Sequence, residues 1–226
     1  MRPPFSALAV LAVLASVAAL VTGCGAGDDW SDPHPRPTAI GALGAGFIDA
    51  GRRPAPEATT TPRPGSWNGV HPPRDYRVVL LTSGHDRATR TLVTAVESWA
   101  AEEHVSLRRV TAADSADLVP SVTRALGMRP DLVISAGNDL IDPLATVTPN
   151  HLTQQFLVLG AELAEPTANV TAVDWSGASF RGEGLGMSST YDARSFTGPR
   201  CSAAVRAGVA AVLHELTGIV VWLDQD

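Results

Sequence analysis

The stretch Pro130-Asp131-Leu132-Val133-Ile134-Ser135-Ala136-Gly137-Asn138-Asp139 decides the fold. Its apolar run is continuous rather than alternating, and it stops at small and polar residues. A parallel strand that is covered by helices on both faces has this pattern. Because open α/β sheets bind ligands in the loops that follow such strands, Asn138 and Asp139 become candidate binding residues.

Further apolar runs on both sides of this stretch alternate with amphipathic segments. The expected strands are residues 76–82, 105–110, 155–159, 170–175 and 219–223, and the expected helices are residues 88–103, 117–126, 142–148 and 199–216. Asp86, Asp117 and Asp142 stand where N-terminal caps of three of these helices are needed. The alternation predicts an α/β fold, with a doubly wound and mostly parallel sheet flanked by helices, over residues 76–226.

The N-terminus has the pattern of a lipoprotein signal peptide over residues 1–23. Arg2 supplies a positive charge, residues 7–20 are apolar, and Val21-Thr22-Gly23-Cys24 closes the segment. This ending resembles the bacterial lipobox, in which cleavage precedes the cysteine and its thiol receives a diacylglycerol. Acyl chains contribute about 0.8 kcal/mol per buried methylene, so two or three chains hold a domain on a membrane. We expect a lipid anchor at Cys24 on the extracytoplasmic face of the cell membrane; a plain secretory signal with an incidental cysteine is the alternative.

Residues 24–75 contain nine of the 17 prolines, together with many small residues. Such segments stay extended and carry too little apolar surface to fold alone. The composition predicts a lipid-anchored, proline-rich linker. Within it, residues 38–51 carry Ile40, Leu43, Phe47 and Ile48, and they form either a short docked helix or, as we expect, a further piece of linker.

Several short segments carry a family resemblance by their order and spacing. They are Val78–Leu81, Gly84–Asp86, Pro130–Ile134 with Gly137 and Asp142, Phe156–Leu159 and Asn169–Val173. Over residues 76–186 they resemble one lobe of a type I periplasmic substrate-binding protein, in particular of the basic membrane lipoprotein family. The resemblance implies a Rossmann-like lobe that binds a nucleoside-like solute for an ABC importer. The chain departs from that family at Thr89 and Arg90, where a Phe-Asn pair is usual, and it is too short for two lobes.

Polar side chains at the ends of the predicted strands form the candidate ligand site. They are Ser83, His85, Asp86, Asn138, Asp139, Asp174 and Trp175. A small solute would be held by hydrogen bonds from these groups, with the Trp175 ring as a stacking face. Loop polarity and helix capping explain part of the same set without a ligand. The stretch that follows, residues 176–199, is either a lid or disordered.

No residue pattern in the chain is typical of an enzyme, a metal site or a cofactor site. His85-Asp86 lacks further ligands at metal-binding spacing. Gly182–Gly186 is glycine-rich but does not join a first strand to its helix, as a nucleotide-binding loop must. Cys201 precedes an apolar helical run, so we expect a buried side chain rather than a catalytic thiol. With a formal net charge of −6 and no basic stripe, no nucleic-acid partner is expected.

Two functions of different classes remain open. In the first, a membrane-anchored protein binds a small solute for an ABC importer or a sensor, with an ABC permease or another envelope protein as its partner. In the second, a non-enzymatic envelope module has lost ligand binding and uses the sheet for protein–protein contacts. A cleft with convergent polar groups at the strand ends favours the first function, and a filled cleft or an exposed apolar patch favours the second.

The change Cys24→Ala should release the protein from the membrane without unfolding it, because the thiol that would carry the acyl chains is gone. Membrane fractionation measures the release, and circular dichroism checks the fold of the soluble form. Persistence of the variant in the membrane fraction would place the anchor elsewhere.

Overall fold

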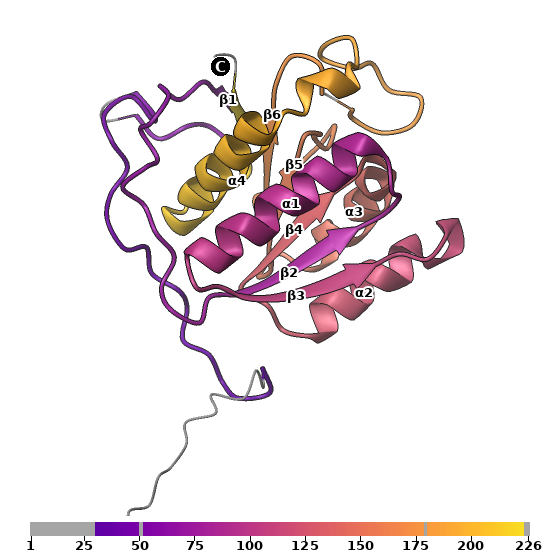
Figure 1. Cartoon of the computed structure of the whole chain (residues 1–226), viewed down its shortest axis with the longest axis horizontal. Coiled ribbons are helices and arrows are strands. Elements are labelled where there is room, and N and C mark those ends of the chain that lie inside the picture. The colour runs from indigo at the N-terminus through magenta and orange to yellow at the C-terminus, as the bar shows by residue number, and fades with distance from the viewer. Residues whose placement is uncertain (1–29, 50–51, 179, 224–226) are drawn as a thin grey trace, which may run out of the picture.

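The computed structural model describes residues 30–49, 52–178 and 180–223, which form a seven-stranded sheet flanked by helices (Figure 1). The strand order is β1-β7-β6-β5-β4-β2-β3, and all neighbouring strands are parallel. The strands are β1 Thr59–Thr60, β2 Arg77–Thr82, β3 Ser106–Thr111, β4 Leu132–Ala136, β5 Gln155–Leu159, β6 Val170–Asp174 and β7 Val220–Trp222. The predicted α/β fold with a doubly wound parallel sheet is therefore confirmed.

Four α-helices cover the two faces of the sheet in the described part of the chain. They are α1 Arg87–Glu102, α2 Leu118–Gly127, α3 Ile141–Val147 and α4 Gly198–Leu213. Figure 1 shows α1 and α4 side by side across one face, and their buried residues belong to one core cluster. The buried residues of α2 and α3 belong to a second cluster on the other face. Each helix lies within a few residues of its predicted range.

Alternate residues of the central strands face the two core clusters. In β2, Val78 and Leu80 pack on the side of α1 and α4, whereas Val79 and Leu81 pack on the side of α2 and α3. All four side chains are completely buried. The neighbouring strand β4 is also buried throughout, and its Ile134 pairs with Leu80. Burial on both faces is the reason why the sequence of these strands is continuously apolar.

The described part of the predicted linker differs from the expectation of a detached tether. Phe47 is only 1% exposed and Trp67 only 7%, and both belong to the core cluster of α1 and α4. Thr59–Thr60 adds strand β1 to β7 at the edge of the sheet. Large aromatic side chains each bury about 150–250 Å² of surface, so a few of them fix a proline-rich segment that has few other apolar residues. Residues 38–49 therefore dock on the domain, without forming the helix that was the alternative.

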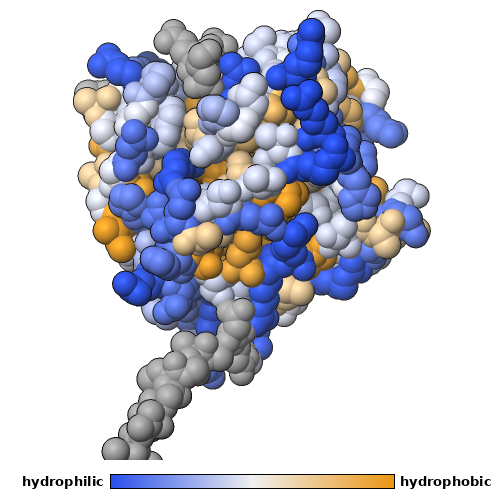
Figure 2. All heavy atoms as spheres, viewed as in Figure 1, coloured by the Kyte–Doolittle hydropathy of each residue, from blue (hydrophilic) through white to orange (hydrophobic). Residues whose placement is uncertain are grey.

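The described helices and surface bear on how the protein meets a membrane. In the part of the chain that the structure describes, no helix is long and apolar enough to cross a bilayer. Figure 2 shows a mixed surface on one face of the molecule, where hydrophilic residues separate small apolar patches. The signal peptide and Cys24 lie outside the described residues, so the lipid anchor stays a prediction.

Helix α4 lies so close to the sheet that one position accepts no side chain. A Cβ atom added at Gly208 would stand 2.5 Å from Leu157 Cδ1 and 2.7 Å from Val173 Cγ2. Leu157 and Val173 are both fully buried in the central strands, so neither side chain can move aside without shifting the core. The glycine therefore sets the distance between α4 and strands β5 and β6.

Replacing Gly208 with alanine should lower the free energy of unfolding by about 1–3 kcal/mol, the usual cost of overpacking a core. The control is Gly127→Ala at the end of α2, where nothing lies within 4 Å of the added Cβ. That change should be neutral or stabilising by up to about 1 kcal/mol, because alanine favours helix over glycine. Denaturant unfolding measures both; equal stabilisation by the two changes would contradict the close approach.

Candidate functional site

The candidate site lies where the chain reverses its direction through the sheet. From β2 the chain passes to β3 on one side, and it then returns to β4 on the other side of β2. The loops that leave β2 and β4 therefore diverge and open a crevice at the carboxyl ends of these strands. In open α/β sheets this switch point is the place where ligands bind.

Three of the predicted site residues meet at this point. Ser83 follows β2, Asn138 and Asp139 follow β4, and Ser83 Oγ donates a hydrogen bond of 3.2 Å to Asp139 Oδ2. Gly137 makes the approach of the two loops possible. Its φ of 120° belongs to the glycine region, and an added Cβ would stand 2.9 Å from the Ser83 carbonyl oxygen.

Two adjoining cavities open at the switch point, and Ser83, Asn138 and Asp139 line both of them. The smaller has a volume of about 210 Å³ and extends toward α1, where Asp86, Leu92, Tyr191 and Phe196 line it. The larger has a volume of about 520 Å³ and extends toward α3. Its other lining residues include His85, Asp114, Asp142, Phe180 and Glu183. The larger volume lies in the usual range for small-molecule sites.

Asp86 acts both as a helix cap and as a wall of the smaller cavity. One carboxylate oxygen accepts the Thr89 backbone N–H at 3.0 Å, and the other accepts the Thr89 hydroxyl at 2.5 Å. The predicted cap of α1 is therefore confirmed. Burial raises the pKa of this carboxyl, but the hydrogen bonds from Thr89 outweigh burial and hold the pKa below its ordinary value. The group thus keeps its negative charge beside the cavity.

Asp174 and Trp175 do not contribute to the crevice, contrary to the sequence prediction. Both are completely buried, and Trp175 offers no exposed ring face for stacking on a ligand. Its indole donates a 3.0 Å hydrogen bond to Ser195 Oγ and packs edge-on against Phe196, with ring centroids 5.0 Å apart. Asp174 Oδ1 accepts the backbone N–H of Trp175 at 2.8 Å. The physical reason is that residues 176–199 fold back over the end of β6 and cover it.

Residues 176–199, described except for residue 179, form walls of both cavities. The first arm of the segment, around Phe180, pairs with the chain just after β5: Phe180 forms an isolated bridge with Ala161, and the Phe180 carbonyl accepts the Glu162 N–H at 2.9 Å. Arg181 Nε lies 3.1 Å from Glu162 Oε1 and fixes this arm further. The other arm carries Tyr191 and the buried Phe196. The aromatic residues in an otherwise glycine- and serine-rich stretch were the signal that could have revealed this packing.

Asp142 does not cap α3, as its position before Pro143 predicted. It lies in the first turn of the helix, and no side-chain hydrogen bond caps that end. Its carboxylate instead accepts the Glu183 backbone N–H at 3.2 Å. The bond ties the tip of the 176–199 segment to α3, at the rim of the larger cavity.

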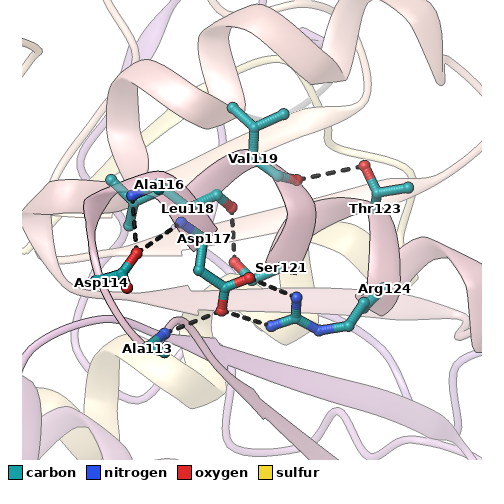
Figure 3. Close-up of polar contacts among 9 residues, drawn as sticks. All are labelled: Ala113, Asp114, Ala116, Asp117, Leu118, Val119, Ser121, Thr123 and Arg124. Atoms are coloured by element: carbon teal, nitrogen blue, oxygen red, sulfur yellow. Dashed lines mark hydrogen bonds and ion pairs between the residues drawn. The ribbon is translucent and has the colours of Figure 1, made fainter.

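Asp117 also differs from its predicted capping role. Figure 3 shows its carboxylate turned toward Ala113 N, at 3.0 Å, and toward two guanidinium nitrogens of Arg124, at 2.6 and 2.8 Å. Asp114 caps this turn instead, because its carboxylate accepts the Ala116 backbone N–H at 2.9 Å. The hydrogen bonds from Arg124, and that from Ala113, lower the pKa of Asp117 to about 2. The cluster fixes the loop that presents Asp114 to the larger cavity.

The crevice is acidic. Five carboxylates line the two cavities, and neither cavity has an arginine or a lysine among its lining residues. The five are Asp86, Asp114, Asp139, Asp142 and Glu183. Burial, followed by the charges of Asp86 and Asp192, raises the pKa of Tyr191, so its hydroxyl stays protonated. Within the described residues, no group of three or more His, Cys, Asp or Glu side chains could hold a metal ion.

Comparisons with known proteins give partial likenesses only. No protein-family model matches the chain, and no curated protein sequence matches it. A solute-binding protein of an ABC transporter system from Aeropyrum pernix K1 is 20% identical over 45% of this chain and 29% of its own, with a TM-score of 0.40. The present chain therefore spans under a third of that protein. The resemblance to the basic membrane lipoprotein family stays a prediction.

Two further structures are similar over part of the chain. A fragment from Peptoclostridium difficile 630, described as a lipoprotein, is 15% identical over 61% of this chain and 98% of its own, with a TM-score of 0.45. A 5-methylthioribose transporter solute-binding protein from Thermotoga lettingae TMO is 22% identical over 45% of this chain and 33% of its own, with a TM-score of 0.38. None of these likenesses is close enough to assign a function.

The thiol of Cys201 should be inert in the folded protein. The side chain is completely buried in α4, and burial raises its pKa to about 12. Because the thiolate is the reactive form, we expect no reaction with a disulfide reagent at pH 8 until the chain is unfolded. Spectrophotometric titration of the Cys24→Ala variant, in which Cys201 carries the remaining thiol, measures this with and without denaturant. Rapid labelling of the native protein would contradict the burial and reopen the catalytic-thiol hypothesis.

Proposed function

We propose that this protein is an extracytoplasmic lipoprotein whose α/β domain binds a small polar solute at the β2–β4 switch point. The observation that carries the proposal is the meeting of Ser83, Asn138 and Asp139 between two adjoining cavities. Loop polarity alone explains polar residues at strand ends, but it does not explain a cavity of about 520 Å³ lined by them. Largely preformed cavities with a few convergent polar groups are the general form of small-molecule sites.

The residues that line the two cavities limit the kind of solute that could bind there. Carboxylates are hydrogen-bond acceptors only, so Asp86, Asp139 and Asp142 select a ligand that offers several donors. Hydroxyl groups of a sugar or nucleoside provide such donors, as do amino groups. An anionic solute would meet repulsion and no arginine in the lining. Phe180, Tyr191 and Phe196 supply the apolar contact area that a ring or a short chain needs.

The proposed location of the protein in the cell rests on the N-terminal sequence. A diacylglycerol on Cys24 would hold the domain at the outer face of the cytoplasmic membrane, with the signal peptide removed. There the domain would deliver its solute to an ABC permease or report its presence to a sensor. A nucleoside-like solute is the specific expectation that the family resemblance adds.

A second function, contact with another protein, is supported by exposed apolar side chains in the 176–199 segment. Leu185 is 51% exposed, Met187 is 48% and Tyr191 is 39%, and all three belong to the segment that walls the cavities. Exposed apolar patches mark protein-contact surfaces, and these three residues lie close together in the sequence of one segment. In this alternative the domain is an envelope module whose 176–199 segment contacts another protein and whose cavities hold only water.

The change Asp139→Asn should weaken binding of the solute about 10- to 100-fold, because hydrogen bonds to a charged group are worth about 1.5–3 kcal/mol. Small molecules released by heat from the purified protein identify the solute by mass spectrometry. Calorimetric titration of that compound then gives the affinities of wild type and variant. Glu97→Gln is the matched control, since Glu97 pairs with Arg109 on the outer side of α1 and lines neither cavity.

Unchanged affinity in Asp139→Asn would place the solute outside the switch point. A wild-type protein that releases no solute and binds none of a set of sugars, nucleosides and amines would contradict solute binding and leave the protein-contact function. Equal losses in Asp139→Asn and Glu97→Gln would indicate an effect on folding rather than on the site.

A further inference from the structure

The start of the described chain is fixed to the end of the sheet opposite the crevice. Trp30 Nε1 donates a 3.0 Å hydrogen bond to Ser106 Oγ at the first residue of β3. The guanidinium carbon of Arg108 stands 4.3 Å from the Trp30 ring centroid, a cation–π geometry. Trp30 is only 4% exposed and belongs to the core cluster of α2 and α3. The Trp30 indole is therefore packed into the domain.

Two more contacts fasten the residues that follow Trp30. Arg77, the first residue of β2, donates to the backbone carbonyls of Trp30 at 3.3 Å and of Asp32 at 3.0 Å. His34 Nε2 lies 3.0 Å from Asp131 Oδ2, just before β4. We call residues 30–37 the strap. It crosses the amino ends of β3, β2 and β4, whereas the candidate crevice lies at their carboxyl ends.

The distance from the strap to the proposed anchor is short. Trp30 is the sixth residue after Cys24. Six fully extended residues span at most about 20 Å. By contrast, a tether that ended at the predicted domain boundary, residue 76, would have let the domain turn freely above the bilayer. The strap thus replaces a long flexible linker by a short connection to one particular side of the molecule.

The two ends of the sheet also differ in charge. The cavities under the strap are lined by Arg36, Arg77 and Arg129, which balance three carboxylates. Arg36 has 79% of its side chain exposed, and Leu152, which lines the same cavity as Arg36, is 60% exposed. The crevice at the other end has five carboxylates and no arginine in its lining. An anionic lipid surface repels the crevice end more than the strap end, within the Debye length of about 8 Å.

We infer that the strap end of the sheet is a membrane-facing surface, which rests against an anionic bilayer and turns the crevice away from it. The inference rests on the proposed lipid anchor at Cys24. The short connection between Cys24 and the strap keeps this end of the sheet close to the bilayer. There the exposed arginine and leucine side chains contact the lipid headgroups. The solute then enters from the side remote from the lipid, and a partner that receives it must reach over the domain or lift it from the surface.

The test uses the full lipoprotein, purified from membranes and reconstituted into vesicles of phosphatidylglycerol and phosphatidylethanolamine. A donor dye is attached to Leu152→Cys at the strap end or, in a second variant, to Leu185→Cys at the crevice rim. Both leucines are exposed, and the buried Cys201 needs no replacement. Energy transfer to an acceptor dye on the lipid headgroups should be several-fold stronger from residue 152 than from residue 185.

Equal transfer from the two positions, or stronger transfer from residue 185, would overturn the orientation while leaving the anchor in place. Loss of vesicle binding by the wild type would overturn the anchor and the orientation together, and vesicle flotation separates the two cases. Trp30→Ala should keep vesicle binding but equalise the transfer, because the freed strap lengthens the tether. Thr38→Ala, an exposed change just past the strap, should keep the contrast; a contrast that survives Trp30→Ala would overturn the role of the strap.

Discussion

Coverage of the sheet on both faces is the constraint on which the rest of the structure depends. The central strands β2, β4 and β5 are parallel and almost entirely buried, so most of their side chains pack against the four helices. Their large polar side chains, Arg77 and Gln155, lie at the strand ends. The candidate crevice and the strap therefore occupy opposite ends of the same strands, and neither could lie on a face of the sheet.

The sequence predicted the parts of the fold that depend on local pattern. The strands from β2 to β7 and the four helices are each recognisable from continuous or amphipathic apolar runs, and Asp86 from its capping position. Strand β1 was missed because two threonines among prolines carry no periodicity, and their partner β7 lies 160 residues away along the chain. Trp30 and Trp67 were missed, and docking of Phe47 was the less favoured alternative, for a related reason: single aromatic anchors dock by tertiary contact, which composition cannot report.

The candidate site was predictable in its centre and not in its walls. Ser83, Asn138 and Asp139 lie directly at strand ends, where topology alone places them together. Trp175 occupies an equivalent strand end and is nevertheless buried, because the later 176–199 segment covers it. Whether a polar loop is a rim or an interior thus depends on where distant residues pack. Asp117 and Asp142 show the same effect, since each leaves its helix end for a partner that the local sequence does not indicate.

The 176–199 segment supplies cavity walls from within the same domain. In proteins that close two lobes over a ligand, the opposite lobe supplies the far wall of the cleft. Here Phe180 and Glu183 on one arm, and Tyr191 and Phe196 on the other, provide walls from the same chain. The bridge from Phe180 to Ala161 and the ion pair of Arg181 with Glu162 hold one arm against the chain just after β5. A solute would thus be enclosed by a local segment rather than by a hinge motion.

The two outermost strands have a consequence for how the protein behaves among its own copies. Open sheets expose unpaired backbone groups at their edges, and these groups recruit strands of other molecules into aggregates. At one edge β1 is only two residues long, which leaves almost no template for such pairing. At the other edge β3 carries the charged side chains of Arg108 and Arg109, and the Trp30 ring stacks against the first of them. The two edges of the sheet are thereby protected from edge-to-edge polymerisation.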